Sequence, residues 1–376
     1  MRPSCLGYEV CEDLGSGTLG EVKLGVCPRT GESVALKLID RANASTRQIE
    51  QATREASALR ALRGAPHVLQ LRATEPRARL REKGANGASR EVFAMVTEFA
   101  ENGDLFELTN TSGPFSEAAA KAIFSQLLDA LRSLDERGIV AHRDLKLENV
   151  LVGSDGELRV ADFNLCARTS GDGGAADDNT APPRRASSSA AAAAAELLHT
   201  PCGSRSYMAP EVIAGRAYHG APADAWSAAV MLFTLLVGHP PFEEASKRCW
   251  FYRKACVEPG KAHLFWGAHG QQPGEPGCAV SLGARALLER LLVAQPADRA
   301  SLESLSNDAW LRPADGADGV AVVAPLSAEA LRAELERRAA LVPHLQKARA
   351  AIAEHRAAGR ASPRGVEDEC ESKDDA

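Results

Sequence analysis

The stretch HRDLKLEN, residues 142–149, decides the fold of this chain. Asp144 offers a carboxylate, Lys146 follows two residues later, and Asn149 adds a side-chain amide three residues beyond the lysine. A carboxylate can orient a hydroxyl nucleophile, and an ammonium group can neutralise phosphoryl oxygens. An amide oxygen is a hard ligand that suits a hard cation such as magnesium. The stretch therefore predicts a loop built for phosphoryl chemistry.

A second candidate metal ligand lies in the sequence DFN, residues 162–164. Asp162 stands thirteen residues after Asn149 and follows a predicted strand at 157–161. Its carboxylate would be the second protein ligand to magnesium. Each short match is common by itself, but their order and spacing together do not arise by chance.

A glycine-rich stretch near the N-terminus, GSGTLGEV at 15–22, has the spacing G-x-G-x-x-G-x-V. The same glycine spacing occurs in dinucleotide-binding proteins, where a helix follows directly. Here residues 21–26 are predicted to form a strand, so the glycines lie in a β-hairpin. Because glycine has no side chain, such a hairpin can close over phosphates and offer them its backbone N–H groups.

Lys37 ends the strand-like run VALK at 34–37. A single lysine at a strand end is usually a solvated charge. Glu55, however, lies on the following predicted helix, near residues 48–62. An ion pair between them would fix the direction of the lysine and allow it to hold the α- and β-phosphates of a nucleotide.

Hydrophobic periodicity divides the chain into two parts. Strand-like runs lie at 8–14, 21–26, 33–39, 68–73 and 92–98, and one helical stretch lies among them. From about 115 to 311 the pattern is mainly helical, for example at 117–137 and 223–237. Two packed α+β lobes joined near 98–104 are expected.

Several segments lie outside these elements. Residues 74–90 are polar and are predicted to loop out between two strands. Residues 169–198, which contain six consecutive alanines, are predicted to be a mobile low-complexity insertion. A linker at 312–326, a helix at 327–358 and a disordered acidic tail at 359–376 follow.

The predicted C-terminal helix has an apolar stripe that Pro343 interrupts. The stripe consists of Leu331, Leu335, Leu341, Leu345 and Ile352. Two interpretations stay open: the helix packs on the body or frays in solvent, or it has a regulatory or partner-binding role.

Composition narrows the class of protein. The net charge of −6 gives no basic footprint for nucleic acid. No run of 18 apolar residues predicts a membrane span, and the first residues lack the apolar centre of a signal peptide. Nine cysteines without a C-x-x-C pair disfavour disulfides and zinc. A cytoplasmic location is expected, with access to the nucleus left open.

Further motifs lie toward the end of the chain: APE at 209–211, DAW at 224–226, PPF at 240–242 and DR at 298–299. With these motifs the chain resembles the eukaryotic protein kinase family over residues 8–311. The resemblance implies an α+β, two-lobed protein-kinase fold. Its N-terminal lobe (8–98) would hold a five-stranded antiparallel sheet and one main helix, and its C-terminal lobe (104–311) would be mainly helical.

The resemblance also implies the roles of the site residues. Asp144, Lys146, Lys37 and Glu55 would be catalytic, and Asn149 and Asp162 would bind Mg²⁺. The residues implied to hold ATP are Leu14, Gly15, Gly17, Gly20, Val22, Ala35, Lys37, Glu98, Ala100, Asp104 and Leu151. Leu14, Val22, Ala35 and Leu151 would sandwich the adenine, residues 98–100 would be the hinge that bonds the base, and Asp104 would approach the ribose.

Other positions are implied to be scaffold. Asp224 would brace the catalytic loop, and Arg299 would pair with Glu211. Thr97, a small residue before the hinge, would leave the back of the ATP pocket accessible. Leu59, Leu71, His142 and Phe163 would stack as a hydrophobic column between the lobes.

Lys146 indicates the serine/threonine type of kinase. The segment TPCGSRSYMAPE at 200–211 is most similar to the calmodulin-dependent and AMP-activated kinase group. Thr200 aligns with the usual activating phosphosite, which implies an upstream activating kinase, and Arg143 would bind the phosphate. An ordinary loop threonine is the alternative. Ser204 is expected to bond Asp144 and Lys146.

Protein substrates are the implied partners. Glu148 and Asp104 lie where the family binds basic residues upstream of the target hydroxyl, so a mild preference for arginine there is expected. Two solvated surface acids are the alternative. No nucleic-acid or membrane partner is expected.

The largest departure from the family pattern is Asn164, which stands where the family has glycine. Asparagine tolerates left-handed backbone better than other non-glycine residues, so the cost is expected to be small. Two other functions stay open: a pseudokinase scaffold that binds nucleotide and partners without catalysis, and a small-molecule kinase. The complete catalytic set argues against the first, and the motifs at 209–211 and 224–226 argue against the second.

Overall fold

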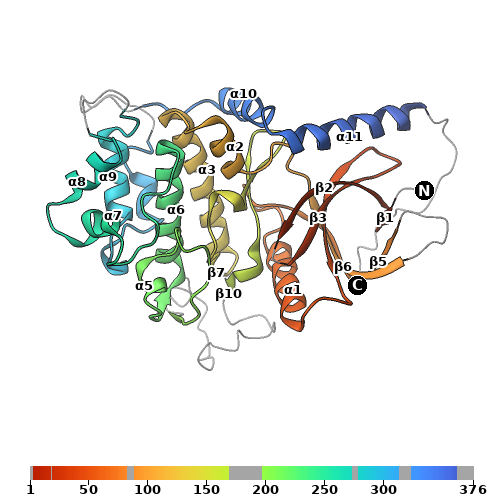
Figure 1. The fold of residues 1–376 in the computed structure, drawn as a ribbon, viewed down its shortest axis with the longest axis horizontal. Helices are drawn as coiled ribbons and strands as arrows, with labels where there is room; N and C mark the ends of the chain where they lie inside the picture. Colours follow the sequence, from red (N-terminus) through yellow and green to blue (C-terminus); the bar gives the residue numbers. More distant parts are fainter. Residues whose placement is uncertain are drawn as a thin grey trace.

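The computed structural model describes residues 3–17, 19–82, 89–168, 197–272, 278–312 and 323–361. The larger sheet occupies the first hundred residues, and most of the helices follow it. The chain accordingly forms a β-rich lobe and a helical lobe side by side (Figure 1). The predicted α+β, two-lobed fold is confirmed.

The N-terminal lobe is built on an antiparallel sheet. Its strands lie in the order β2 (Tyr8–Gly17), β3 (Gly20–Val26), β4 (Ser33–Asp40), β6 (Ser89–Glu98) and β5 (Leu71–Arg81). These are the five predicted strands. A two-residue strand, β1 (Ser4–Cys5), pairs with both β2 and β5 and closes the strand order. Two residues are too few to show an alternating pattern, so β1 could not be predicted from the sequence.

The predicted loop at 74–90 is wrong at both ends, because β5 continues to Arg81 and β6 begins at Ser89. Ala78 and Leu80 face the core of the sheet, and the arginines between and beside them are exposed. This alternation is that of a half-buried strand. The charged residues obscured this alternation in the sequence, because residues 77, 79 and 81 are all arginines.

Helix α1 (Thr46–Ala61) packs against the N-terminal sheet. It begins with a capping box, in which Ser45 and Gln48 satisfy each other's backbone N–H groups. Its buried face includes Ala52, Glu55 and Leu59 at helical spacing. A carboxylate is therefore held on the face that meets the sheet.

The C-terminal lobe is mainly helical. Its helices are α2 (Leu105–Ser112), α3 (Glu117–Glu136), α5 (Pro210–Ile213), α6 (Gly220–Val237), α7 (Trp250–Tyr252), α8 (Ala262–Ala268) and α9 (Leu282–Leu291). Its short strand pairs are β7 (Ile139–Ala141) with β10 (Ala167–Arg168), β8 (Val150–Val152) with β9 (Leu158–Val160), and β11 (Leu197–Leu198) with β12 (Tyr218–His219).

Helix α6 is the apolar centre of this lobe. Among the described helices it alone is long and apolar enough to cross a membrane, but 83% of that stretch is buried inside the fold. Its neighbours include α3 and α9. Helix α6 is therefore a buried core helix of the C-terminal lobe.

The C-terminal segment forms two helices where one was predicted. Helix α10 (Ala328–Ala339) ends before a break, and Pro343 begins α11 (Pro343–Ala361). Proline suits the first turn of a helix because its missing N–H is not needed there. Four residues of the predicted stripe are buried, and Leu341, in the break, is 54% exposed.

Some predicted segments lie outside the described residues. These are residues 83–88 of the predicted loop at 74–90, 169–196 of the predicted insertion, 313–322 of the linker, Thr18 of the glycine-rich hairpin and 362–376 of the tail.

A buried ion pair joins two distant parts of the C-terminal lobe. Arg299 Nη1 and Nη2 donate to the Glu211 carboxylate over 2.8 and 3.0 Å, and the arginine side chain is fully buried. The guanidinium also donates to the carbonyl oxygens of Val293 and Pro222. The predicted scaffold pair is confirmed.

Replacing Glu211 by alanine would leave the buried guanidinium of Arg299 without its counter-charge. We expect Glu211→Ala to lower the free energy of unfolding by about 3–5 kcal/mol, as measured by urea denaturation. Glu336→Ala is the matched control, because Glu336 pairs with Arg332 on an exposed helix face and should change little. Equal effects of the two variants would contradict the prediction.

Candidate active site

An ion pair at the junction of the two lobes organises the site. Lys37 on β4 places its Nζ 2.6 Å from Glu55 Oε2 on α1 and 3.7 Å from Asp162 Oδ1. Burial by itself would lower the pKa of Lys37, but the carboxylates of Glu55 and Asp162 outweigh burial and raise the pKa. Lys37 is therefore held as a cation between the sheet, the helix and the segment that follows β9.

The glycine-rich stretch forms a hairpin between β2 and β3, in which Gly17 pairs with Gly20. A Cβ atom built on Gly20 would lie 2.4 Å from the carbonyl oxygen of Leu38 on β4. No side chain fits there, so Gly20 allows the hairpin to lie close against the neighbouring strand. The predicted β-hairpin, rather than a helix after the glycines, is confirmed.

Asp144 is held by a network of donors in the loop after β7. Its Oδ1 accepts from the N–H and the hydroxyl of Ser204, over 2.9 and 3.0 Å. Its Oδ2 lies 3.0 Å from Lys146 Nζ, and Lys146 Nζ in turn donates to Ser204 Oγ over 3.0 Å. The expected contacts of Ser204 with Asp144 and Lys146 are confirmed.

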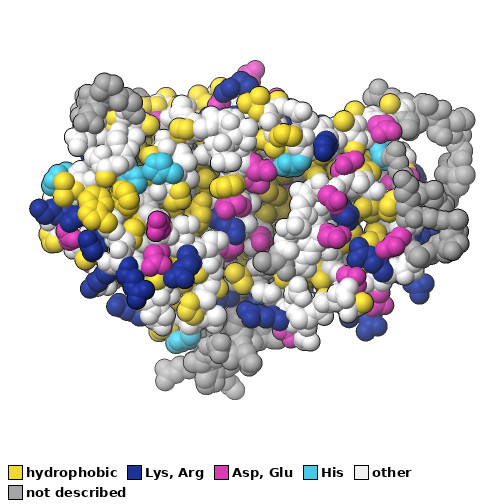
Figure 2. All heavy atoms as spheres, in the orientation of Figure 1, with side chains coloured by type: hydrophobic (Ala, Val, Ile, Leu, Met, Phe, Trp, Pro, Cys, Tyr) yellow, Lys and Arg dark blue, Asp and Glu magenta, His cyan; other side chains and the backbone are white. Residues whose placement is uncertain are grey.

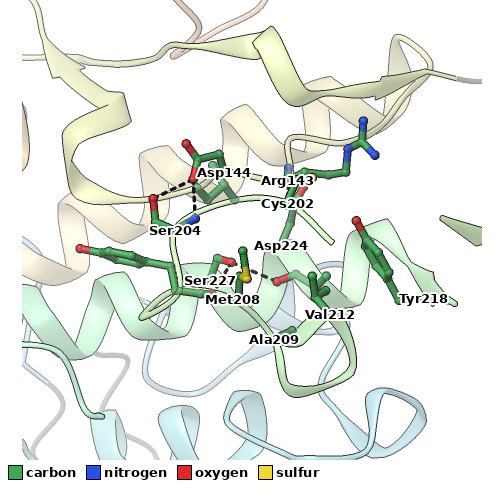
Figure 3. A pocket seen from close by; sticks show the side chains of 13 residues that line it. Arg143, Asp144, Cys202, Ser204, Met208, Ala209, Val212, Tyr218, Asp224 and Ser227 are labelled. Carbon is green, nitrogen blue, oxygen red and sulfur yellow. Dashed lines mark hydrogen bonds between the residues drawn. The ribbon is translucent and has the colours of Figure 1, made fainter. Parts of the chain in front are cut away.

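A second carboxylate holds the backbone of this loop. Asp224, at the start of α6, is buried and accepts from the N–H groups of His142 and Arg143 over 2.7 and 3.1 Å. Burial raises the pKa of Asp224, and these donors oppose that effect. The expected bracing role is confirmed by this geometry: Asp144 points into a pocket beside α6 while Asp224 lies beneath its loop (Figure 3).

Asn149 and Asp162 fit a magnesium ion. The Asn149 amide nitrogen donates to the carbonyl and Oδ2 of Asp144, over 2.8 and 3.2 Å, so the amide oxygen is left as an acceptor. Among the described residues, the buried Asp162 Oδ1 has no hydrogen-bond partner. A side-chain amide oxygen and a carboxylate oxygen are both hard ligands of the kind that Mg²⁺ prefers.

The hinge is fixed through the side chain of Glu98. Its carboxylate accepts from Arg159 Nε over 3.2 Å and from the Gln70 N–H over 2.8 Å. Ala100 is buried, and within the described ranges its N–H forms no hydrogen bond. A purine edge offers an acceptor for such a group. Sequence reasoning missed Arg159 and Gln70, since nothing local marks them as partners of the hinge.

The predicted adenine-binding residues lie on strands that meet at this hinge. Leu14, Val22 and Ala35 lie on β2, β3 and β4, and Ala35 pairs in register with Thr97 on β6. Leu151 on β8 forms a β-bridge with Asp104, and both residues belong to the C-terminal lobe. Thr97, the residue before the hinge, is 5% exposed, and an accessible back of the ATP pocket stays a prediction.

Comparison with known proteins agrees with this arrangement. Residues 8–311 match the family described as protein kinase domain. The chain belongs to the protein kinase family. It is 37% identical over 307 residues to CBL-interacting protein kinase 4 of Oryza sativa subsp. japonica, and 33% identical over 310 residues to CBL-interacting serine/threonine-protein kinase 26 of Arabidopsis thaliana. The matches cover 80% and 81% of this chain but only 56% and 58% of those relatives.

The backbone of residues 162–164 of the kinase domain differs from the expectation based on Asn164. The left-handed conformation falls on Asp162, at φ 62°, whereas Asn164 lies in a turn of 3-10 helix, at residues 163–165. The tolerance of asparagine for positive φ is therefore not used in this state. The Asn164 side chain is buried, and its Oδ1 has no partner among the described residues.

Part of the predicted hydrophobic column between the kinase lobes is visible. The rings of His142 and Phe163 lie 4.8 Å apart, and Leu59 on α1 is buried. Leu71 is half-buried and packs against the same core. Helix α1 also contacts residues 163–165, so the column continues from one lobe to the other.

Asp104 of the kinase domain caps α2, because its Oδ1 accepts from the Glu107 N–H over 2.8 Å. Burial, together with the negative charges of Glu107 and Glu148, raises its pKa to about 7. The implied ribose-binding carboxyl therefore titrates near neutral pH.

The raised pKa of Asp104 gives the folded chain a pH dependence. The unfolded carboxyl releases its proton near its ordinary value of 3.8, whereas the folded one retains it until about pH 7. Folding takes up a proton between these values, so stability falls as pH rises through that interval. Asp104→Asn keeps an N-cap and cannot titrate. Urea unfolding should show wild type losing stability relative to Asp104→Asn between about pH 4 and about pH 7, with the difference levelling off above that. A pH-independent difference would argue against the shift.

Proposed function

We propose that this chain is a protein serine/threonine kinase, which transfers the γ-phosphoryl group of ATP to a hydroxyl of a protein substrate. The observation that carries the proposal is the placement of Lys37 between Glu55 and Asp162. A kinase needs the lysine–glutamate pair and the metal-binding aspartate in place together. The relatives named as protein kinases support the same function.

Each residue has a part in the transfer. Asp144 orients the substrate hydroxyl and accepts its proton as the oxygen bonds to the γ-phosphorus and the bond to the β-phosphate oxygen breaks. Lys146 neutralises the transferred oxygens, and Lys37 holds the α- and β-phosphates. Asn149 and Asp162 would hold Mg²⁺, which neutralises phosphate charge when it is bound.

We expect purified wild type to label a generic basic protein substrate in the presence of labelled ATP and magnesium. Asp144→Asn should lower kcat by about a hundredfold or more, because the amide cannot accept the proton of the hydroxyl. The variant should still bind ATP, since the nucleotide contacts are untouched. Equal turnover by the two proteins would refute the proposal.

One observation favours the alternative of a nucleotide-binding scaffold without catalysis. Asn164 stands two residues after Asp162, where the family has glycine, and its buried Oδ1 has no hydrogen-bond partner in the part of the chain that the structure describes. In the assay above, a scaffold would bind ATP without transfer. The variant Asn164→Gly distinguishes the kinase from the scaffold further. If Asn164 is what prevents catalysis, the glycine variant should gain a kinase activity that wild type lacks.

A preference for arginine upstream of the phosphorylated residue is part of the proposal. Glu148 is exposed, and its charge and that of Glu107 act on Asp104, so three carboxylates lie near one another. Figure 2 shows acidic side chains gathered around the junction of the lobes. Peptides with and without an upstream arginine, compared in the same assay, test the preference.

We also propose that phosphorylation of Thr200 by an upstream kinase activates the chain. The Tyr218 hydroxyl donates to the Thr200 carbonyl oxygen over 3.2 Å. The same hydroxyl contacts Arg143, the residue beside the catalytic aspartate. A phosphate on Thr200 would therefore be added near a guanidinium, with which it can form charge-assisted hydrogen bonds.

Thr200→Ala should lower kcat about tenfold or more relative to wild type that an upstream kinase has phosphorylated, because the phosphate-to-arginine bonds cannot form. Phosphopeptide mass spectrometry would confirm the modification of wild type. Ser304→Ala is a control, since Ser304 has an exposed hydroxyl bonded to the carbonyl oxygen of Ser301. Unchanged activity of Thr200→Ala would leave Thr200 as an ordinary loop residue.

The relatives' names state that they interact with CBL. Because the match covers just over half of each relative, it does not support CBL binding by this chain. A cytoplasmic location stays a prediction.

A further inference from the structure

Helices α10 and α11 form a strap, residues 328–361, which runs along one side of the molecule from the helical lobe to the β-rich lobe (Figure 1). The strap lies outside the catalytic motifs, because its residues follow the kinase domain, which ends at residue 311. Its contacts fall in three places, namely the C-terminal lobe, the hinge and the N-terminal sheet.

The first end of the strap is anchored in the C-terminal lobe by Arg338. This side chain is 4% exposed, and its guanidinium donates to the carbonyl oxygens of Gly113 and Pro114 over 2.7 and 2.9 Å. It also lies 3.8 Å from the ring centroid of Phe115. Leu331 and Leu335 are buried beside it. Helix α10 is thus fixed to the loop that follows α2.

The middle of the strap packs on the hinge. Arg349 Nη2 donates to Asn102 Oδ1 over 2.5 Å. Gly103, at φ 74°, lies so close to Leu345 that a Cβ atom there would be 2.8 Å from Leu345 Cδ1. Phe99 packs against the cluster that α11 forms with β3. Three of the five residues from 99 to 103 therefore meet the strap or its cluster.

The other end of the strap is anchored on the glycine-loop strands. Ala348 and Ile352 form a buried cluster with Leu24 and Val26 of β3. Leu14 of β2, an implied adenine contact, packs against this cluster. His355 lies 3.0 Å from Glu9 on β2. Helix α11 therefore ties the roof of the nucleotide site to the hinge.

Asn102 carries the strap contact into the floor of the site. It is 1% exposed, its amide nitrogen donates to the Gly153 carbonyl over 2.7 Å, and its N–H donates to the Val152 carbonyl over 3.1 Å. The Val152 N–H donates back to the Gly103 carbonyl over 2.8 Å. The residue before Val152 on β8 is Leu151, which is implied to form the floor of the adenine site.

We propose that the strap sets the geometry of the nucleotide site and that Arg349 is a positioning residue for ATP, acting through Asn102 and the hinge. The proposal rests on the proposed kinase function. A hinge held in its binding conformation loses less entropy when the nucleotide binds, so the strap raises affinity for ATP. Arg349 itself contacts Asn102, whose other partners are the backbone groups of Val152 and Gly153, so affinity for the protein substrate should not depend on this arginine.

The test compares Arg349→Ala with Arg349→Lys and with Lys347→Ala, an exposed lysine on the same helix. Calorimetry gives the Kd for ATP with magnesium, steady-state kinetics give KM for ATP and for peptide, and thermal melting reports folding. We expect Arg349→Ala to raise Kd and KM for ATP about three- to tenfold, with the peptide KM unchanged. Arg349→Lys should restore most of the affinity, and Lys347→Ala should match wild type.

A wild-type Kd for ATP in Arg349→Ala, or an equal rise in both KM values, would overturn the proposal. Amide hydrogen exchange of wild type offers a second measurement that needs no variant. Because coupling is reciprocal, saturating ATP and magnesium should slow exchange in residues 343–355, and unchanged exchange would also overturn it. Wild type that binds ATP without transferring phosphate refutes the kinase function alone, whereas wild type that binds no ATP refutes both.

Discussion

The ion pair of Lys37 with Glu55 is the contact on which the site depends. It joins a strand to the one main helix of the N-terminal lobe, and the nearby Asp162 brings the C-terminal lobe to the same point. An ammonium group this deeply placed is costly unless opposite charges surround it. The lysine is therefore directed toward the space where phosphates would lie, and α1 and the segment after β9 each place a carboxylate beside it.

Two aspartates in the C-terminal lobe are surrounded by different hydrogen-bond donors. These donors distinguish the carboxylate that holds a loop from the one proposed to meet the substrate. Asp224 is buried, and both of its oxygens accept from backbone N–H groups, so it fixes a loop. Asp144 lines a pocket, and its donors are a serine, an asparagine and a lysine. The same functional group is thus used once to hold the backbone and once to meet a reactant, and the difference lies in which donors surround it.

Sequence reasoning reached the parts of the site that short motifs encode. Lys37, Glu55, Asp144 and Asn149 could be placed because residue type and spacing specify each role, and the structure pairs Lys37 with Glu55 and Asn149 with Asp144. It did not reach contacts between residues far apart in sequence. Arg349 and Asn102 are 247 residues apart, and a charged residue on an amphipathic helix is ordinarily solvent-facing. Strand β1 and the end of β5 were missed for a different reason, because brevity and arginine density masked the alternation.

The strand pairs on either side of residues 169–196 have a consequence for how this chain can vary. β10 is paired with β7 before that segment, and β11 is paired with β12 after it. With both ends fixed independently, the number of residues between them is uncoupled from the catalytic geometry. The entropic cost of lengthening a closed loop grows only with the logarithm of its length, about 0.6 kcal/mol for each doubling. This stretch is consequently a place where evolution, or an engineer, can insert sequence while leaving the reaction centre as it is.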